Sequence, residues 1–450
     1  MINLATLSAL ALVLGYATFQ RAGVEPGTWN LCLLAIGSIA VVYFAIPKRP
    51  EVRSLDRVVA FSAAAVMFLA AFQLVPLPVA LLRVLSPTRV ELLQATASLT
   101  GGPATYATLS AVPYQTAQYV LTLAGYLLIF LVIRDVCLRT GERTWSPAWP
   151  LLLVGGLEAL LGVYQATSGA TDSASGTYDN RDHYAGLLEM ILPFAALYPA
   201  AILQRDRERQ ESTVAPAFQA SLILAIAVVI LAASIYSLSR MGFLASLAAL
   251  FVAGASAVSA RGWNVDYRKP AAWWRRMLPA ASVGIVILLG FLYLPSDPLA
   301  RRFADLAATE DISADTRAQI WRDTSGLIRA YPLFGCGLGG YESCFLRYKS
   351  VAPMNTVDYA HNDYLQVWAE FGVFGLIAGI IFVARLLYRS MRASLYAPSH
   401  DHRYLAIACT SSFVAILLHS SVDFNMYVPA NGFVFAWVAG IAGAYVNRRE

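Results

Sequence analysis

The chain has 450 residues, of which 58% are hydrophobic and only 14% are charged, and its mean hydropathy is +0.57. Soluble domains are far less apolar, so this composition excludes a single soluble domain and predicts a polytopic membrane protein surrounded by lipids. The formal net charge of +5 is explained by basic loops on the inner membrane face, and it does not indicate a nucleic-acid partner.

Apolar runs long enough to cross a bilayer recur along the whole chain and predict about twelve transmembrane helices in an all-α fold. The first run lacks a basic leading segment and a good cleavage site, so we expect a true span rather than a cleaved signal peptide. The runs lie near residues 2–19, 29–46, 58–75, 116–133, 149–166, 184–203, 217–236, 243–260, 277–295, 372–387, 404–420 and 432–446.

The distribution of Lys and Arg predicts the orientation of these helices. Most of the 33 basic residues lie in one set of loops, and short loops rich in Lys and Arg are typically cytoplasmic, so both termini are predicted to be cytoplasmic. We expect three parts: helices 1–9 in residues 1–295, with polar outer loops at 167–183 and 237–242; one large outer loop at 296–371; and helices 10–12 in residues 372–450.

The segment after the third predicted span differs from a transmembrane helix. Pro76 and Pro78 interrupt the chain, and residues 79–97 place apolar side chains at helical spacing opposite charged ones such as Arg83 and Arg89. This pattern predicts one helix on the outer membrane surface. Such a helix either borders an entry for a lipid chain or only packs on the surface.

A polar segment, residues 177–186, leads directly into the sixth predicted span. Asn180, Arg181 and His183 of this segment suit contact with an anion or a sugar, because the planar guanidinium of Arg presents a fork of donors to phosphate. The alternative is a solvated connector. The short outer turn at 237–242 keeps Arg240 near the bilayer, where it either faces a polar cavity or snorkels to the interface as an anchor.

The large outer loop is expected to contain a helix that begins near Ser313, carries Arg317 and ends at a proline. A glycine-rich turn, residues 333–341, follows. It lacks the Lys-Ser/Thr ending and the preceding strand of a P-loop, so we expect its glycines to allow close approach of the backbone to a ligand or a neighbouring helix. Cys336 and Cys344 are predicted either to form a disulfide, which an outer compartment allows, or to pack as two thiols.

Residues 359–366 form a polar stretch where this loop meets the tenth predicted span, and they include His361, one of only five histidines. A fourth polar connection at the outer face, residues 419–425, carries His419. Polar groups thus collect in the outer connections, so we expect the chemistry at the outer membrane surface. The residues expected to bind substrate or to orient His361 are Asn180, His183, Asn362, Asp363, Tyr364 and His419.

The order of these motifs resembles the bacterial O-antigen ligase superfamily, which includes the ligases, O-antigen and exopolysaccharide polymerases, and protein O-oligosaccharyltransferases. His361-Asn362, then nine residues, then Gly372-Val373-Phe374-Gly375 matches the family pattern His-Asn-x9-Gly-x-x-Gly. Leu376-Ile377 stands where some ligases continue with Thr-His. Further matches are Asn180 to Gly186, Ser239-Arg240, Thr316-Arg317 with Trp321 ahead of Tyr331 to Gly337, and His419-Ser420 with Val422-Asp423.

This resemblance implies a helical fold of the glycosyltransferase-C type in the bacterial inner membrane, with the active site at the periplasmic face. It implies inverting transfer of a glycan from an undecaprenyl diphosphate carrier to an acceptor hydroxyl, without a metal or other cofactor. The acceptor is lipid A core for a ligase and a growing glycan for a polymerase. Two alternatives belong to other classes, a polysaccharide or lipid transporter and a structural component of an assembly complex.

Within the enzyme hypothesis we predict that His361 is the catalytic base, because neutral imidazole accepts a proton at physiological pH. The alternative is a hydrogen-bonded structural histidine. The leaving diphosphate requires nearby positive charge, and Arg181, Arg240 and Arg317 are predicted to supply it.

Overall fold

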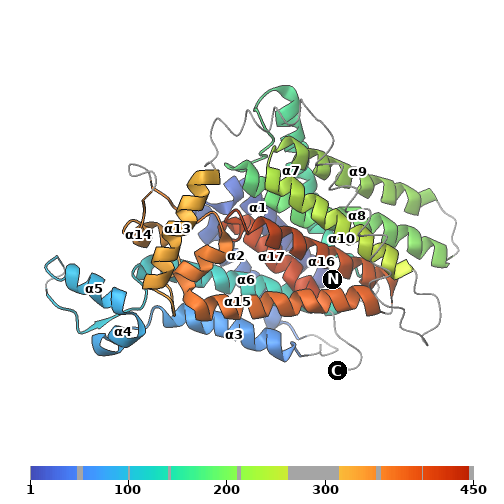
Figure 1. Ribbon diagram of the computed structural model, residues 1–450. Coiled ribbons are helices and arrows are strands. Elements are labelled where there is room, and N and C mark those ends of the chain that lie inside the picture. The colour runs from blue at the N-terminus through green and yellow to red at the C-terminus, as the bar shows by residue number, and fades with distance from the viewer. Residues whose placement is uncertain are drawn as a thin grey trace.

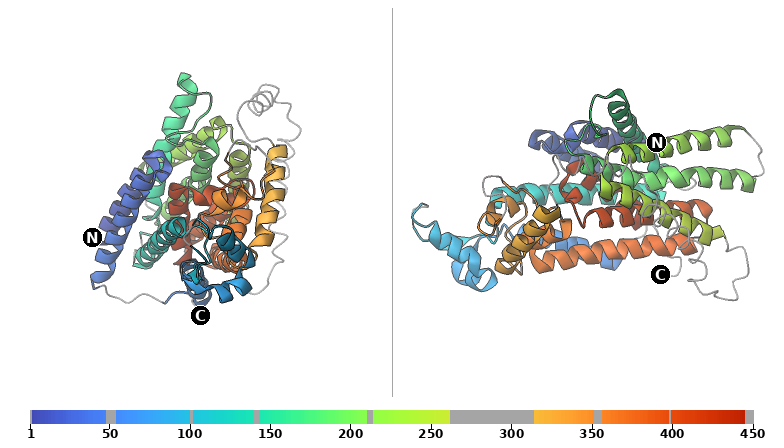
Figure 2. Two further views of the ribbon diagram at one scale, coloured as in Figure 1. Left: turned by 90° about the vertical axis from the view of Figure 1, so that its left-hand side faces the viewer. Right: turned by 45° about the horizontal axis from the view of Figure 1, so that its top comes forward.

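The structure is a computed structural model that describes residues 2–47, 54–99, 102–139, 143–209, 214–261, 314–350, 356–397 and 399–444. Over these ranges the chain is almost entirely helical, and most helices run side by side in an elongated bundle (Figure 1). Four short helices, α4 (Val79–Leu85), α5 (Pro87–Ala95), α13 (Ala314–Ala330) and α14 (Tyr341–Phe345), gather at one end, which we call the loop end (Figure 2).

Eight of the helices in the described part of the chain are long and apolar enough to cross a membrane, as expected for a polytopic membrane protein. Three further helices, α3 (Arg57–Phe72), α16 (His400–His419) and α17 (Pro429–Gly443), also coincide with predicted spans. The run predicted near 277–295 lies outside the described residues, so the total number of spans stays a prediction. The eight are α1 (Ile2–Phe19), α2 (Pro26–Ala45), α6 (Pro113–Arg139), α7 (Ala148–Ser168), α8 (Arg181–Arg209), α9 (Val214–Tyr236), α10 (Arg240–Arg261) and α15 (Asp363–Tyr396).

Helix α8 is the central helix of the bundle. Of its most apolar window, 83% is buried inside the protein, because α8 packs against α9, α10 and α16. Its first turns bury polar residues, among them His183 and Glu189. The polar residues in its first turns therefore face other protein groups.

The segment predicted as one surface helix over 79–97 is instead two short helices, α4 and α5, and this corrects the prediction. The break falls at Ser86, whose φ of −154° is extended, because Pro87 disfavours the helical conformation in the residue before it. A two-residue antiparallel ladder, β1 (Leu77–Pro78) with β2 (Tyr106–Ala107), joins the two ends of this segment. The fold is therefore nearly, and not purely, α-helical.

Helix α15 begins at Asp363, before the span predicted over 372–387, and it is kinked at Gly372, which has a φ of +69°. The glycine-rich turn from the outer loop fits against this kink. The amide of Val373 donates to the carbonyl of Pro332 at 2.9 Å, and the amide of Cys336 donates to the carbonyl of Ala369 at 2.9 Å. Backbone groups of the outer loop thus pair with the backbone groups that the kink leaves without helical partners. Of the two alternatives for the glycine-rich turn, its glycines approach a neighbouring helix.

Cys336 and Cys344 are both free thiols, and they pack in the same apolar cluster, in which Cys336 is fully buried. Of the two alternatives from the sequence, the structure shows the packed thiols and not the disulfide. The helix expected in the outer loop is confirmed as α13, which buries Ile320 and Leu327 and ends before Pro332.

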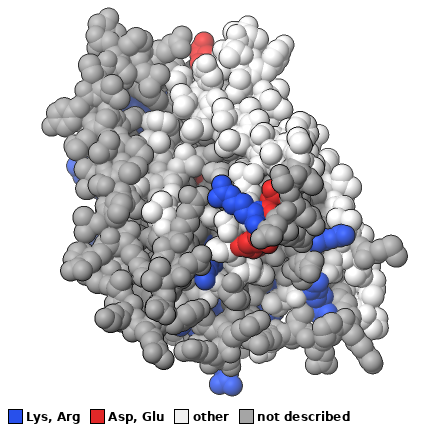
Figure 3. All heavy atoms as spheres, turned by 90° about the vertical axis from the view of Figure 1, so that its right-hand side faces the viewer, with Lys and Arg blue, Asp and Glu red and all other residues white. Residues whose placement is uncertain are grey.

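The end of the bundle opposite the loop end is held together by ion pairs. Asp56 caps α3 by accepting from the amide of Val58, and its carboxylate also pairs with Arg385 at 2.7 Å and with Arg389 at 3.0 Å. Figure 3 looks onto this end and shows Lys and Arg side chains at several places on it. It is the end to which the sequence assigns the basic loops.

Candidate active site

His361 stands in a strained backbone conformation at the loop end. Its φ is +48°, in the left-handed region that residues other than glycine rarely adopt. The next residue, Asn362, caps α15 by accepting from the amide of Leu365, and its side-chain amide donates to the carbonyl of Ser421 at 2.8 Å. The amide of Asp363 donates to the carbonyl of Ser420 at 2.9 Å. These bonds fix the chain immediately after His361 and hold the strained conformation in place.

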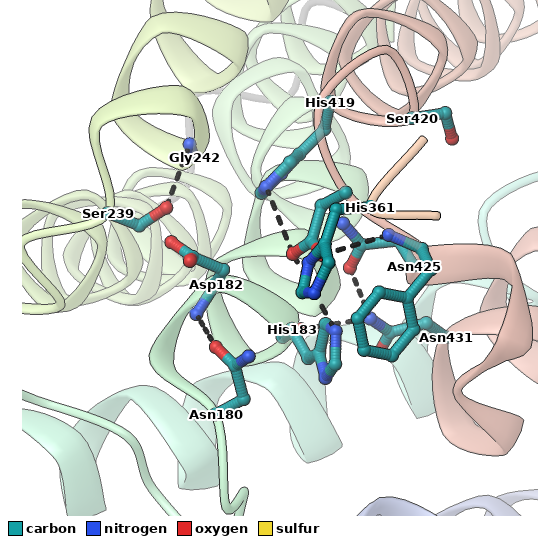
Figure 4. Close-up of polar contacts among 12 residues, drawn as sticks. Asn180, Asp182, His183, Ser239, Gly242, His361, His419, Ser420, Asn425 and Asn431 are labelled. Atoms are coloured by element: carbon teal, nitrogen blue, oxygen red, sulfur yellow. Dashed lines mark hydrogen bonds and ion pairs between the residues drawn. The ribbon is translucent and has the colours of Figure 1, made fainter. Parts of the chain in front are cut away.

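Asp423 lies at the centre of three imidazole rings. Its Oδ1 atom is 3.5 Å from Nδ1 of His361, and its Oδ2 atom is 3.6 Å from Nε2 of His183 and 4.0 Å from Nε2 of His419. The side chain of Asp423 is only 4% exposed, whereas that of His361 is 17% exposed. The rings come from the N-terminus of α8, the start of α15 and the C-terminus of α16, and Figure 4 shows them converging. His361 is thus the histidine of the three that a ligand reaches most readily.

The charge of Asp423 is stabilised by this arrangement. Burial alone would raise the pKa of its carboxyl group, but the imidazoles of His183, His361 and His419 outweigh burial and hold the pKa well below its usual range. Asp423 is therefore a carboxylate at physiological pH. A carboxylate at Nδ1 of His361 orients the ring and stabilises its protonated form.

A second buried carboxyl group, Glu189 of α8, contacts His419, one of the three histidines. Its Oε2 atom is 2.9 Å from Nδ1 of His419, and the two side chains are 0% and 1% exposed. The sequence prediction did not include Glu189. The sequence does contain a signal for Glu189, because this residue is a carboxylate inside an apolar run. Ionisable residues within membrane spans are usually functional.

Phe424 packs against two of the histidine rings. Its ring centroid is 4.5 Å from that of His183 and 5.0 Å from that of His361, edge to face in both cases. Tyr359 stacks on Phe424 at 4.0 Å with nearly parallel rings. The aromatic contacts therefore limit how far either imidazole rotates.

Two asparagines from the last part of the chain complete the cluster. The side-chain amide of Asn431 donates to the carbonyl of His183 and to Oδ1 of Asn425, both at 2.9 Å (Figure 4). A β-carbon on Gly186 would overlap Asn425, so the glycine allows the first turn of α8 to approach this pair. Three further buried polar atoms of this cluster have no hydrogen-bond partner within the described protein, and unsatisfied groups of this kind often belong to functional sites: Glu189 Oε1, Asp363 Oδ1 and Asn425 Nδ2.

Two of the predicted arginines stand at helix N-termini beside this cluster. Arg181 is the first residue of α8 and Arg240 the first of α10, and these first turns touch, because a β-carbon on Gly242 would overlap the side chain of Ala185. Ser239 caps α10 by accepting from the amide of Gly242 at 3.1 Å (Figure 4). Helix N-termini carry a partial positive charge, so the place where these two N-termini meet favours anions.

The third predicted arginine, Arg317, lies on α13, one turn before Trp321. The indole of Trp321 donates to the carbonyl of Ala360 at 2.9 Å, directly before His361. The Nε atom of Arg317 is buried and has no hydrogen-bond partner. Helix α13 thus contacts the residue directly before His361, and Arg317 lies one turn away on the same helix.

The remaining predicted residues have local roles in the structure. Asn180 accepts from the amide of Asp182 at 2.7 Å, at the start of α8. Asp363 accepts from the hydroxyl of Ser420 at 2.7 Å, and the hydroxyl of Tyr364 donates to the carbonyl of Leu417. In the described part of the chain, no three His, Cys, Asp or Glu side chains are arranged to hold a metal ion.

Comparison with known protein families adds a direct observation. Residues 225–380 match the family model described as O-antigen ligase. This match confirms the resemblance to the O-antigen ligase superfamily. Members of this superfamily are membrane glycosyltransferases, either ligases or polymerases, that act on lipid-linked glycans and their acceptors. The matched range includes Arg240, Arg317 and His361, whereas Glu189 and Asp423 lie outside it. The chain matches no curated protein.

Proposed function

We propose that this protein transfers a glycan from an undecaprenyl diphosphate carrier to an acceptor hydroxyl, by inversion and without a metal, with His361 as the catalytic base. The observation that carries the proposal is the contact between Nδ1 of His361 and the carboxylate of Asp423. It leaves Nε2 of the same ring as the proton acceptor. The family match supports the same chemistry.

The proposed reaction is a single displacement. Nε2 of His361 takes the proton of the acceptor hydroxyl while the oxygen attacks the anomeric carbon of the glycan. The bond between that carbon and the diphosphate breaks, and undecaprenyl diphosphate leaves as an anion. Asp423 stabilises the imidazolium that forms, and a positioned base of this kind accelerates such reactions by roughly 10²- to 10⁴-fold.

The leaving diphosphate is proposed to bind where the first turns of α8 and α10 meet. Arg181 and Arg240 are the first residues of these two helices, and Arg317 of α13 is proposed as a third cation for the diphosphate. Charges and dipoles fixed in a partly dry site stabilise a developing anion strongly. No cofactor is required in this scheme.

An apolar cavity between α15 and α16 is proposed to hold the carrier lipid. It has a volume of about 340 Å³, begins at Asp363 and Ser420, and continues along Gly379, Ile380 and Ala384 toward the middle of α15. Its walls expose almost only carbon, which suits an isoprenoid chain. The head of this cavity is the segment that holds His361 in place, so a lipid in it would extend from the reacting diphosphate.

We infer that the loop end faces the periplasm and that both termini face the cytoplasm of a bacterial inner membrane. Among the described residues, Arg385 and Arg389 lie toward the end opposite His361, and this supports the proposed orientation under the positive-inside rule. The proposed acceptor is lipid A core. A growing glycan is the alternative, and it would make the protein a polymerase of the same superfamily.

The test uses the full-length protein in proteoliposomes with undecaprenyl diphosphate-linked glycan extracted from the host. Release of undecaprenyl diphosphate is measured together with the product. Transfer that depends on His361 and persists after chelation is expected, and His361→Ala is expected to lose it although it is still inserted. Near-normal transfer by His361→Ala, or movement of glycan across the membrane without any transfer, would overturn the proposal. Glycan on lipid A core identifies a ligase, and a longer carrier-linked chain identifies a polymerase.

A further inference from the structure

Glu189 and His419 form a buried pair that the reaction scheme above does not use. We propose that this pair is ionic and that His419, as its cation, offsets part of the charge of Asp423, so that Asp423 orients His361 without keeping it protonated. The two residues are thus positioning residues that set the pH range in which His361 acts as a base. This inference rests on the proposed role of His361.

The first argument is the geometry of His419. Its Nδ1 atom is 2.9 Å from Glu189, and its Nε2 atom is 4.0 Å from Asp423. Both ring nitrogens therefore face a carboxylate oxygen. A neutral imidazole has only one N–H to offer, whereas the imidazolium has one for each of these neighbours.

The second argument is the burial of Glu189. Its side chain is fully buried, and its Oε1 atom has no hydrogen-bond partner. An unpaired buried carboxylate is very costly, so a cation beside it strongly stabilises the ionised form. His419 is the cation that lies within contact distance.

The third argument is that the two carboxylate oxygens of Asp423 face different histidines. Oδ1 faces His361, whereas Oδ2 faces His183 and His419. A positive charge on the Oδ2 side reduces the negative potential that Asp423 exerts on His361. His361 consequently keeps its orientation but gives up its proton more readily.

Other charged groups also face these rings. Asp182 of α8 and Asp363 of α15 interact with His419 electrostatically. On the His361 side, Asp363 lies two residues along the chain, and α13 brings Arg317 close through the contact of Trp321 with Ala360. None of these groups makes the link between Glu189 and Asp423 that the two nitrogens of His419 make.

The experiment measures the rate of undecaprenyl diphosphate release between pH 5 and pH 9 for the full-length protein and three variants. His419→Gln removes the cation beside Asp423, and Glu189→Gln removes the carboxylate that keeps His419 charged. We call the part of the profile in which the rate rises with pH, as His361 loses its proton, the acid limb. It is expected to move to higher pH in both variants, by on the order of one pH unit. The rate above pH 8 should recover toward that of the wild type.

Glu158→Gln is the matched control. Glu158 is also a fully buried carboxyl group inside a span, but it accepts from Thr177 and does not contact the histidines. This variant is expected to lose stability without moving the acid limb. Restoration of the wild-type profile by Glu189→Asp would support the ionic pair.

An unchanged acid limb in folded Glu189→Gln and His419→Gln, with only a uniform loss of rate or stability, would overturn this inference. A failure of the proposed function would be distinguishable from this result, because His361→Ala would then still transfer glycan. If either variant fails to insert, the other together with Glu189→Asp still decides the question.

Discussion

The backbone of Gly372 lies against the carbonyl group of Leu333, so closely that a β-carbon on residue 372 would overlap that carbonyl. The φ of +69° at Gly372 also lies in the left-handed region. This contact is where the glycine-rich turn of the outer loop meets the kink in α15, and it therefore aligns the loop with the start of the helix that carries His361.

Gly372→Ala is consequently expected to destabilise the protein by at least about 1 to 2 kcal/mol, the cost of a left-handed L-residue, and to lower transfer further by shifting the outer loop. Gly379→Ala is the matched control, since it is helical and has open space around its α-carbon. That change should be neutral or slightly stabilising. Thermal unfolding in detergent compares the two, and equal stability of both variants would contradict the role given to Gly372.

Asp423→Asn tests the carboxylate at His361. The amide keeps the size of the side chain but cannot stabilise the imidazolium, so the transfer rate is expected to fall on the order of 10²- to 10⁴-fold. The acid limb of the rate profile should move to lower pH, opposite to the shift expected for Glu189→Gln. A variant with wild-type rates at every pH would show that His361 works without Asp423.

The same substitution changes how stability depends on pH. The neighbouring imidazoles outweigh burial and hold the pKa of Asp423 well below its usual range, so its folded pKa lies below the unfolded value of about 3.9. Asp423 therefore stabilises the fold above the unfolded pKa, and it loses this contribution only as the pH falls through the folded pKa. The difference in unfolding free energy between wild type and Asp423→Asn should not shrink between pH 7 and pH 5. A difference that vanishes near pH 6 in chemical unfolding would contradict this assignment.

Features that depend on local sequence were predictable. The apolar runs identified the helices that the structure describes, and the apolar side of α13 was read from the spacing of Ile320 and Leu327. His361 was singled out because it stands where a polar loop meets an apolar helix.

Features that depend on distant contacts were not predictable in the same way. The kink in α15 is stable only because the carbonyls of Pro332 and Leu333 accept from amides beyond Gly372. The role of Asp423 depends on the packing of α8 against α16, which brings His183 beside the 419–425 turn. Glu189 was not predicted because a hydropathy average over a window of apolar residues hides a single carboxylate. Its partner His419 was among the residues expected to bind substrate or to orient His361.

The apolar cavity between α15 and α16 provides the last test. Gly379 lines this cavity, and apart from its own helix backbone no atom lies within 4 Å of the point where a β-carbon on this residue would stand, so Gly379→Phe should fill the space without disturbing the helix. If the carrier lipid binds there, the KM for the lipid-linked donor should rise on the order of tenfold or more, because a substantial part of the apolar contact is lost. Gly254→Phe is the control, since Gly254 is also open but lies on α10 away from the cavity. An equal KM for both variants would show that the isoprenoid chain binds elsewhere. A loss of stability in Gly379→Phe alone would show that the phenyl ring displaces protein side chains and does not enter open space.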